Sequence, residues 1–114
     1  GNVKEARRAY EVYLKTSPDD AAALHNYGLA LLAEGNAAKA VTPLRDAIRR
    51  APTNAASYSA LAVALIHTKD YAGAWSTLAD GAAIAPANTD ILINQILLQA
   101  CLKDADDKKH GKKK

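Results

Sequence analysis

The chain has 114 residues, 49% of them apolar, with 26 alanines and six aromatic residues; this length and composition predict one small domain of closely packed helices and argue against a sheet. Five lysines after position 107 dominate the net charge of +3, since residues 1–107 carry ten basic and twelve acidic side chains. This balance argues against nucleic-acid binding, which needs a basic patch on the domain itself. The single cysteine excludes an internal disulfide, and no apolar run reaches the roughly 18 residues of a membrane span.

Two features concern the origin of the chain. It contains no methionine, which indicates a fragment or a processed chain whose targeting signal would not be visible. The alanine-rich composition suggests a bacterial source, and one cysteine is compatible with the cytoplasm or the periplasm.

Several residue types recur at a spacing of 34. The three prolines that follow apolar stretches are 34 residues apart, and small or apolar residues share the same period. The recurring sets are Pro18, Pro52 and Pro86; Ala6, Ala40 and Ala74; Tyr10, Leu44 and Leu78; and Leu24, Tyr58 and Leu92. Such agreement at one period indicates an internal repeat.

Each period divides into two helical stretches with apolar residues at helical spacing. Gly35-Asn36 separates the two stretches in one repeat, and Pro52 ends the second stretch. The pattern predicts a first helix within residues 1–17, followed by helices near 20–33, 37–50, 55–67, 71–84 and 89–103. Helices of about 14 residues are marginal alone, so their stability must come from stacking.

Positions that are 34 residues apart form columns, and the residues in these columns resemble the tetratricopeptide repeat (TPR) family. The resemblance rests on Leu24, Tyr27, Gly28, Leu31, Ala40, Leu44, Ala47 and Pro52, and on Tyr58, Leu61, Ala62, Leu65, Ala74, Leu78 and Pro86. It implies an all-α, right-handed superhelical stack of antiparallel helix pairs with about six helices. The expected domain covers residues 1–103, as a half repeat 1–20, repeats 21–54 and 55–88, and a half repeat 89–103, followed by a charged, disordered tail 104–114.

In this family the first helix of each pair lines a concave groove. The resemblance therefore implies an inner stripe of Ala22, His25, Leu29, Leu32 and Ala33; Ala56, Ser59, Val63, Ile66 and His67; and Asp90, Ile93, Leu97, Ala100 and Cys101, with Asn26 and Asn94 beside it. This stripe is largely apolar and has no basic residue. It predicts a groove for an apolar or amphipathic segment of a partner protein, and no binding of the acidic C-termini of heat-shock chaperones. Alternatively, some of these residues pack between neighbouring helices.

The last predicted helix carries larger apolar residues than the earlier ones. Ile91, Leu98 and Leu102 replace Ala23, Ala30 and Glu34 of the first complete repeat. An end helix should become more polar, because its outer face meets water. The substitution predicts self-association, either head-to-tail with residues 1–17 of a second copy or as a two-fold dimer through residues 91–102.

No catalytic or metal-binding pattern is present in the sequence. His25, His67 and His110 are scattered, and none has a metal-ligand spacing from another histidine or from Cys101. No glycine-rich phosphate loop occurs. We therefore expect a protein that is not an enzyme and that uses no cofactor.

Overall fold

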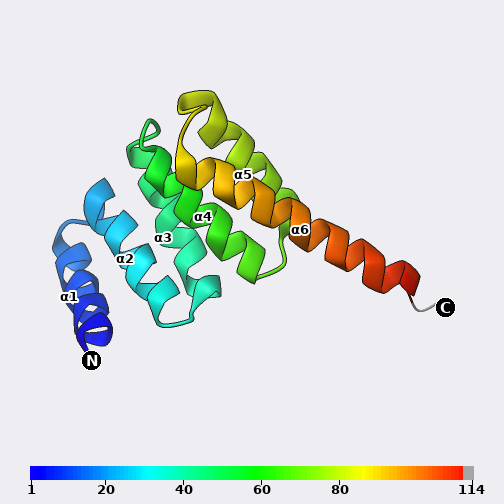
Figure 1. The fold of residues 1–114 in the computed structure, drawn as a ribbon. Helices are drawn as coiled ribbons and strands as arrows, with labels where there is room; N and C mark the ends of the chain where they lie inside the picture. The colour runs from blue at the N-terminus through cyan, green and yellow to red at the C-terminus, as the bar shows by residue number, and fades with distance from the viewer. Residues whose placement is uncertain (112–114) are drawn as a thin grey trace.

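The computed structural model describes residues 1–111, and over that range it contains six α-helices and no strand. They are α1 (Asn2–Thr16), α2 (Ala21–Ala33), α3 (Ala37–Arg50), α4 (Ala55–His67), α5 (Tyr71–Ile84) and α6 (Thr89–Gly111). Successive helices pack side by side into an elongated stack (Figure 1) with extents of 56 × 32 × 19 Å. The predicted all-α solenoid is therefore confirmed.

The helix starts follow directly from short polar residues in the loops. Each of α2 to α6 is preceded by an aspartate or asparagine whose side-chain oxygen accepts a hydrogen bond from a backbone N–H in the first turn. These capping residues are Asp20, Asn36, Asn54, Asp70 and Asn88. Such caps satisfy amide donors that the helix itself leaves without partners.

The turns inside the two complete helix pairs have the same backbone path. Gly35 and Lys69, which are one period apart, have φ values of +80° and +65°. In both turns the next amide donates back into the helix, from Asn36 to Leu31 and from Asp70 to Leu65, at 2.8 Å. Glycine adopts this left-handed conformation freely, whereas lysine is strained in it.

Small residues set the close contact between the helices of a pair. Gly28 is buried on α2, and a Cβ atom placed there would lie 2.5 Å from Cγ of Leu44 on α3. The same column in the next pair holds Ala62, which has no exposed surface. Close approach therefore needs glycine or alanine here, as the sequence pattern indicated.

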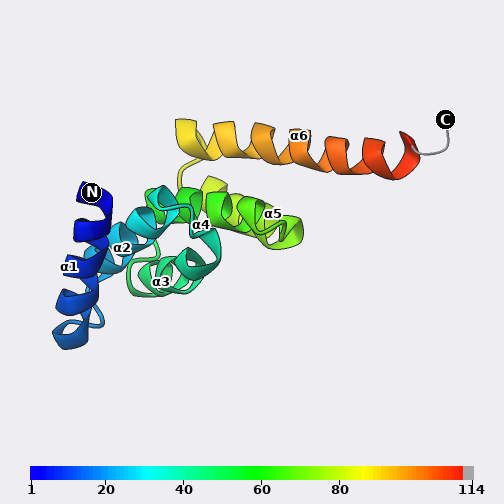
Figure 2. The same cartoon turned by 90° about the horizontal axis from the view of Figure 1, so that it is seen from below.

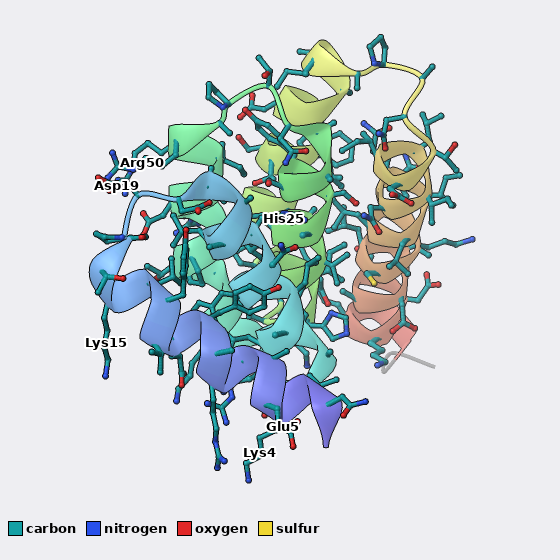
Figure 3. All side chains as sticks on the ribbon, turned by 90° about the vertical axis from the view of Figure 1, so that its left-hand side faces the viewer. Lys4, Glu5, Lys15, Asp19, His25 and Arg50 are labelled. Carbon is teal, nitrogen blue, oxygen red and sulfur yellow. The ribbon has the colours of Figure 1, made fainter. Side chains whose placement is uncertain are left out.

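Charged groups attach α1 to the rest of the stack. Arg7 Nε donates to Glu34 at 2.5 Å and its Nη1 to Glu11 at 3.0 Å, while the Tyr27 hydroxyl donates to Glu11 at 2.9 Å. The hydrogen bond from Tyr27 lowers the pKa of Glu11, and burial raises the pKa of Tyr27. At the other end of α1, Arg50 pairs with Asp19 at 2.7 Å (Figure 3).

The last helix extends further than the sequence pattern predicted. The expected helix ended near residue 103, but α6 continues to Gly111 and projects past the α4–α5 pair (Figure 1 and Figure 2). No proline or glycine interrupts residues 104–110, and Lys108 pairs with Asp104 one turn earlier at 3.2 Å. Residues 112–114 of the expected disordered tail lie outside the described residues.

Candidate functional site

A cleft of about 360 Å³ lies across the first helices of the successive pairs. Its lining residues are His25, Leu29 and Leu32 of α2; Ala56, Ser59, Ala60 and Val63 of α4; and Asp90 of α6. We call this surface the A-helix groove. Leu29 and Val63 share one 34-residue column, and Ala56 and Asp90 share another, so stacking of the repeats brings equivalent positions to the same face.

The groove combines small residues with larger aliphatic ones, of which Leu29 is exposed and Leu32 and Val63 are half-buried. On α4, Ala56, Ser59 and Ala60 have short side chains and leave room above the helix. Leu29 lines the groove on α2 and is 41% exposed, although leucine is usually buried. This arrangement offers apolar surface that a partner side chain could remove from water.

Two polar contacts lie under the groove and join its helices. His25 Nδ1 is 2.9 Å from Ser57 Oγ, which joins α2 to α4 (Figure 3). Asn94 donates from Nδ2 to Ser59 Oγ at 2.7 Å, which joins α4 to α6. Burial lowers the pKa of His25, so its imidazole is neutral at pH 7.

The structure distributes the sequence-predicted groove residues over several environments. Seven of them line the groove, namely His25, Leu29, Leu32, Ala56, Ser59, Val63 and Asp90. Ile66 and Asn94 are buried and do not line the cleft, and Asn94 instead donates to Ser59 in the contact between α4 and α6, which corrects their placement on the groove surface. Ala60 was missed, because its column holds Asn26 and Asn94 in the other repeats.

Four more predicted groove residues, Asn26, His67, Ile93 and Leu97, are exposed but lie outside this cleft. Asn26 lines a separate cavity of about 370 Å³ between α1 and α2, together with Tyr10 and Tyr13. His67 is exposed on α4, with its Nδ1 2.9 Å from the Val63 carbonyl oxygen. Ile93 and Leu97 are 55% and 43% exposed on α6.

The predicted self-association residues need a correction. Ile91 and Leu98 have no exposed surface and are part of the core of the chain, so neither is available to a second molecule. The equivalent small residues of the earlier repeats are also buried, for example Ser57 at 1% and Ala64 at 0%. The larger side chains therefore fill space beneath α6. Leu102 is 38% exposed, so it alone of the three remains available to a second molecule.

The exposed apolar surface of α6 lies on its outer side. Leu92, Ile93, Ile96 and Leu97 are between 43% and 67% exposed and lie at helical spacing. We call these four residues the α6 outer face. Leu24 and Gly28, in the columns of Leu92 and Ile96, are buried in the α2–α3 pair, whereas α6 contacts only α4 and α5 over the described residues.

The described part of the chain contains no group of three or more histidine, cysteine, aspartate or glutamate residues that could hold a metal ion. Cys101 is a partly buried free cysteine at the edge of the core. Over the same part of the chain, no helix has the length and apolar character needed to cross a membrane.

A stack of antiparallel helix pairs with a groove on its first helices defines an α-solenoid interaction scaffold. A tetratricopeptide repeat model matches residues 1–55, and a second one matches residues 31–96, which is more than half of the chain. The chain belongs to the tetratricopeptide repeat family.

The comparisons with individual proteins concern the fold. The structure is similar to the TPR2B-domain:pHsp70 complex of yeast Sti1, with a TM-score of 0.77 and 24% sequence identity over 90% of this chain and 85% of that chain. No curated protein matches the sequence. At this level of identity, the likeness to the Sti1 domain shows a shared fold.

Proposed function

We propose that the chain is a non-enzymatic adaptor that binds an apolar or amphipathic segment of a partner protein in the A-helix groove. The observation that carries this proposal is the cleft itself, which exposes Leu29 on α2 beside Leu32 and near Val63 on α4. An apolar segment placed there would gain about 25 cal/mol for each Å² removed from water. Proteins of this family typically act as interaction modules, which supports the same function.

The residues that line the groove carry no positive charge, so we do not expect the groove to bind acidic peptides. The domain of Sti1 is described in complex with pHsp70, but no lysine or arginine is among the residues that line the groove here. A terminal carboxylate would lose its water without gaining a charged donor. We expect calorimetry with an acidic chaperone C-terminal peptide to show no micromolar binding.

A displayed library of random peptides about twelve residues long tests the main proposal, with the full chain as the immobilised target. We expect apolar sequences to be enriched and their synthetic versions to bind. Leu29→Glu should weaken that binding about tenfold or more, because it places a charge against the apolar segment. Ile84→Glu on α5 is the matched control, since Ile84 is 39% exposed and lies outside the groove.

Two results would contradict groove binding. One is a library that yields no enriched peptide. The other is an equal loss of binding in Leu29→Glu and Ile84→Glu, which would place the contact elsewhere or indicate a general loss of folding. Circular dichroism of both variants separates these explanations.

The α6 outer face favours self-association as a second candidate function. In the complete pairs, the columns of Leu92 and Ile96 are covered by the second helix of the same pair. The occupant we propose is α1 of a second copy, because α1 carries the second-helix columns and borders the cavity lined by Tyr10 and Tyr13. The resulting contact would be head-to-tail.

Light scattering behind gel filtration, over about a hundredfold range of concentration, tests this second candidate. We expect the molar mass of the unaltered chain to rise with concentration. Ile96→Glu should keep the molar mass at that of one chain, whereas Ile84→Glu should leave the rise unchanged. A constant mass near 12.0 kDa for the unaltered chain would overturn self-association. That outcome would leave groove binding unaffected.

A further inference from the structure

We propose that the partner segment bound in the A-helix groove carries a lysine or arginine that pairs with Asp90. This inference rests on the proposed function, since it specifies the chemistry of the segment in the same groove. Asp90 is exposed in the first turn of α6 and is the only lining residue with a formal charge at pH 7. The other lining side chains are aliphatic, apart from Ser59 and the neutral His25.

The usual structural roles of an aspartate at this position are already taken or are weak. Asn88 is the capping residue of α6, since its Oδ1 accepts from the Ile91 amide at 3.1 Å. A carboxylate in the first helical turn interacts favourably with the helix dipole, but a solvated group gains little from this. Among the described residues, no lysine or arginine forms an ion pair with Asp90.

A bound apolar segment changes the surroundings of this carboxylate. Covering the groove removes water from the Asp90 carboxylate. The free-energy cost of removing that water without providing a partner is larger than the free energy that one hydrogen bond contributes. A neutral segment leaves that cost in place, and an acidic segment adds repulsion. A basic side chain removes the cost through a charge-assisted hydrogen bond, so Asp90 selects for basic partners and against acidic ones.

The positions of the lining residues determine where the basic residue lies in the bound segment. Leu29 and Leu32 line the groove on α2, Val63 lies between on α4, and Asp90 is on α6. A segment that crosses the groove therefore meets the aliphatic residues with one part and Asp90 with its end. We expect aliphatic residues and a lysine or arginine at a fixed separation in the bound peptides.

The same displayed library of random peptides tests this inference when it is selected against the full chain and against Asp90→Asn. Basic residues should be enriched at one position beside aliphatic ones for the unaltered chain, and this enrichment should disappear for Asp90→Asn. Asp80→Asn is the matched control, because Asp80 is an exposed aspartate on α5 outside the groove. It should select the same basic peptides as the unaltered chain.

A selected peptide then gives the quantitative test. Replacing its basic residue with norleucine should weaken binding to the unaltered chain and to Asp80→Asn about tenfold, the loss expected for one charge-assisted hydrogen bond. The replacement should change binding to Asp90→Asn by less than about twofold. Thermal unfolding of Asp90→Asn shows whether the helix dipole contributes to any loss.

The outcomes distinguish this inference from the proposed function. Apolar peptides that are enriched without a basic residue, or an equal norleucine effect in the unaltered chain and Asp90→Asn, would overturn the pairing and leave groove binding standing. A library with no enriched peptide would overturn both.

Discussion

Helices α2 and α6 occupy the same place in their repeats, and α6 carries the larger side chain on both of two faces, but only one of these larger side chains is buried. On the inner face, α2 has Ala30 where α6 has Leu98, and both are buried. On the outer face, α2 has buried Gly28 where α6 has Ile96, which is 67% exposed. Residue size in these columns therefore depends on which neighbouring helices cover them, and a shared column does not guarantee shared burial.

The largest expected effect tests the inner face of α6. Leu98→Ala should lower the free energy of unfolding by about 3 kcal/mol, because it removes a fully buried side chain and leaves a cavity. Leu97→Ala, one residue away and 43% exposed, should cost less than about 1 kcal/mol. Urea unfolding followed by circular dichroism gives both values, and equal losses would contradict the burial assigned to Leu98.

The next effect tests the column shared by Gly28 and Ile96. Gly28→Val should cost about 2 kcal/mol, because the added atoms meet the buried side chain of Leu44. Ile96→Val changes the same column of α6 and should stay within about 0.5 kcal/mol. If Gly28→Val were neutral in a denaturant titration, the close approach of α2 and α3 would be wrong.

A smaller gain is expected in the turn that follows α4. Lys69→Gly should stabilise the chain by about 1 kcal/mol, because it relieves the left-handed backbone that Gly35 already accommodates in the preceding pair. Lys69→Ala removes the charge and keeps the strain, so it should give no comparable gain. A shift in the thermal midpoint of both variants by the same amount would assign the effect to charge.

The smallest expected effect is the dependence of the stability of the fold on pH. The folded chain lowers the pKa of His25 through burial, so the unfolded chain binds more protons once the pH falls below about 6.5. Stability should therefore decrease gradually from pH 7 to pH 5.5, and further below about pH 4.5, where protonation of Glu11 disrupts its bonds to Tyr27 and Arg7. Urea midpoints measure this, and His25→Gln should remove the decrease above pH 5.5.

The sequence was enough to predict the helices, their order and their pairing. The period of 34 residues aligned the prolines, the capping residues and the small residues at close contacts, all of which depend on local geometry. The faces of α6 were harder to predict. Small residues such as Ala23 and Ala30 are equally compatible with an outer face and with close packing, so their columns did not reveal that Ile91 and Leu98 lie inside.

The groove was predictable to the extent that its residues repeat. His25 and Ser59 share one column, as do Leu29 and Val63, and all four line it. Asn94 and Ile66 were misplaced because a first helix also contacts the next first helix, and the boundary between that contact and open surface depends on side-chain packing. The length of α6 was missed because charged residues are typical of both tails and exposed helices.

The uninterrupted length of α6 has a mechanical consequence. Its first turn holds Asp90 at the groove, while its last turns stand clear of the other helices (Figure 2). At 1.5 Å per residue, Asp90 and Lys108 are joined by a stiff rod about 27 Å long. A tilt of about 5° at the groove would move the far end by about 2 Å. Any change in the tilt of α6 at the groove would therefore be accompanied by a larger displacement of its far end.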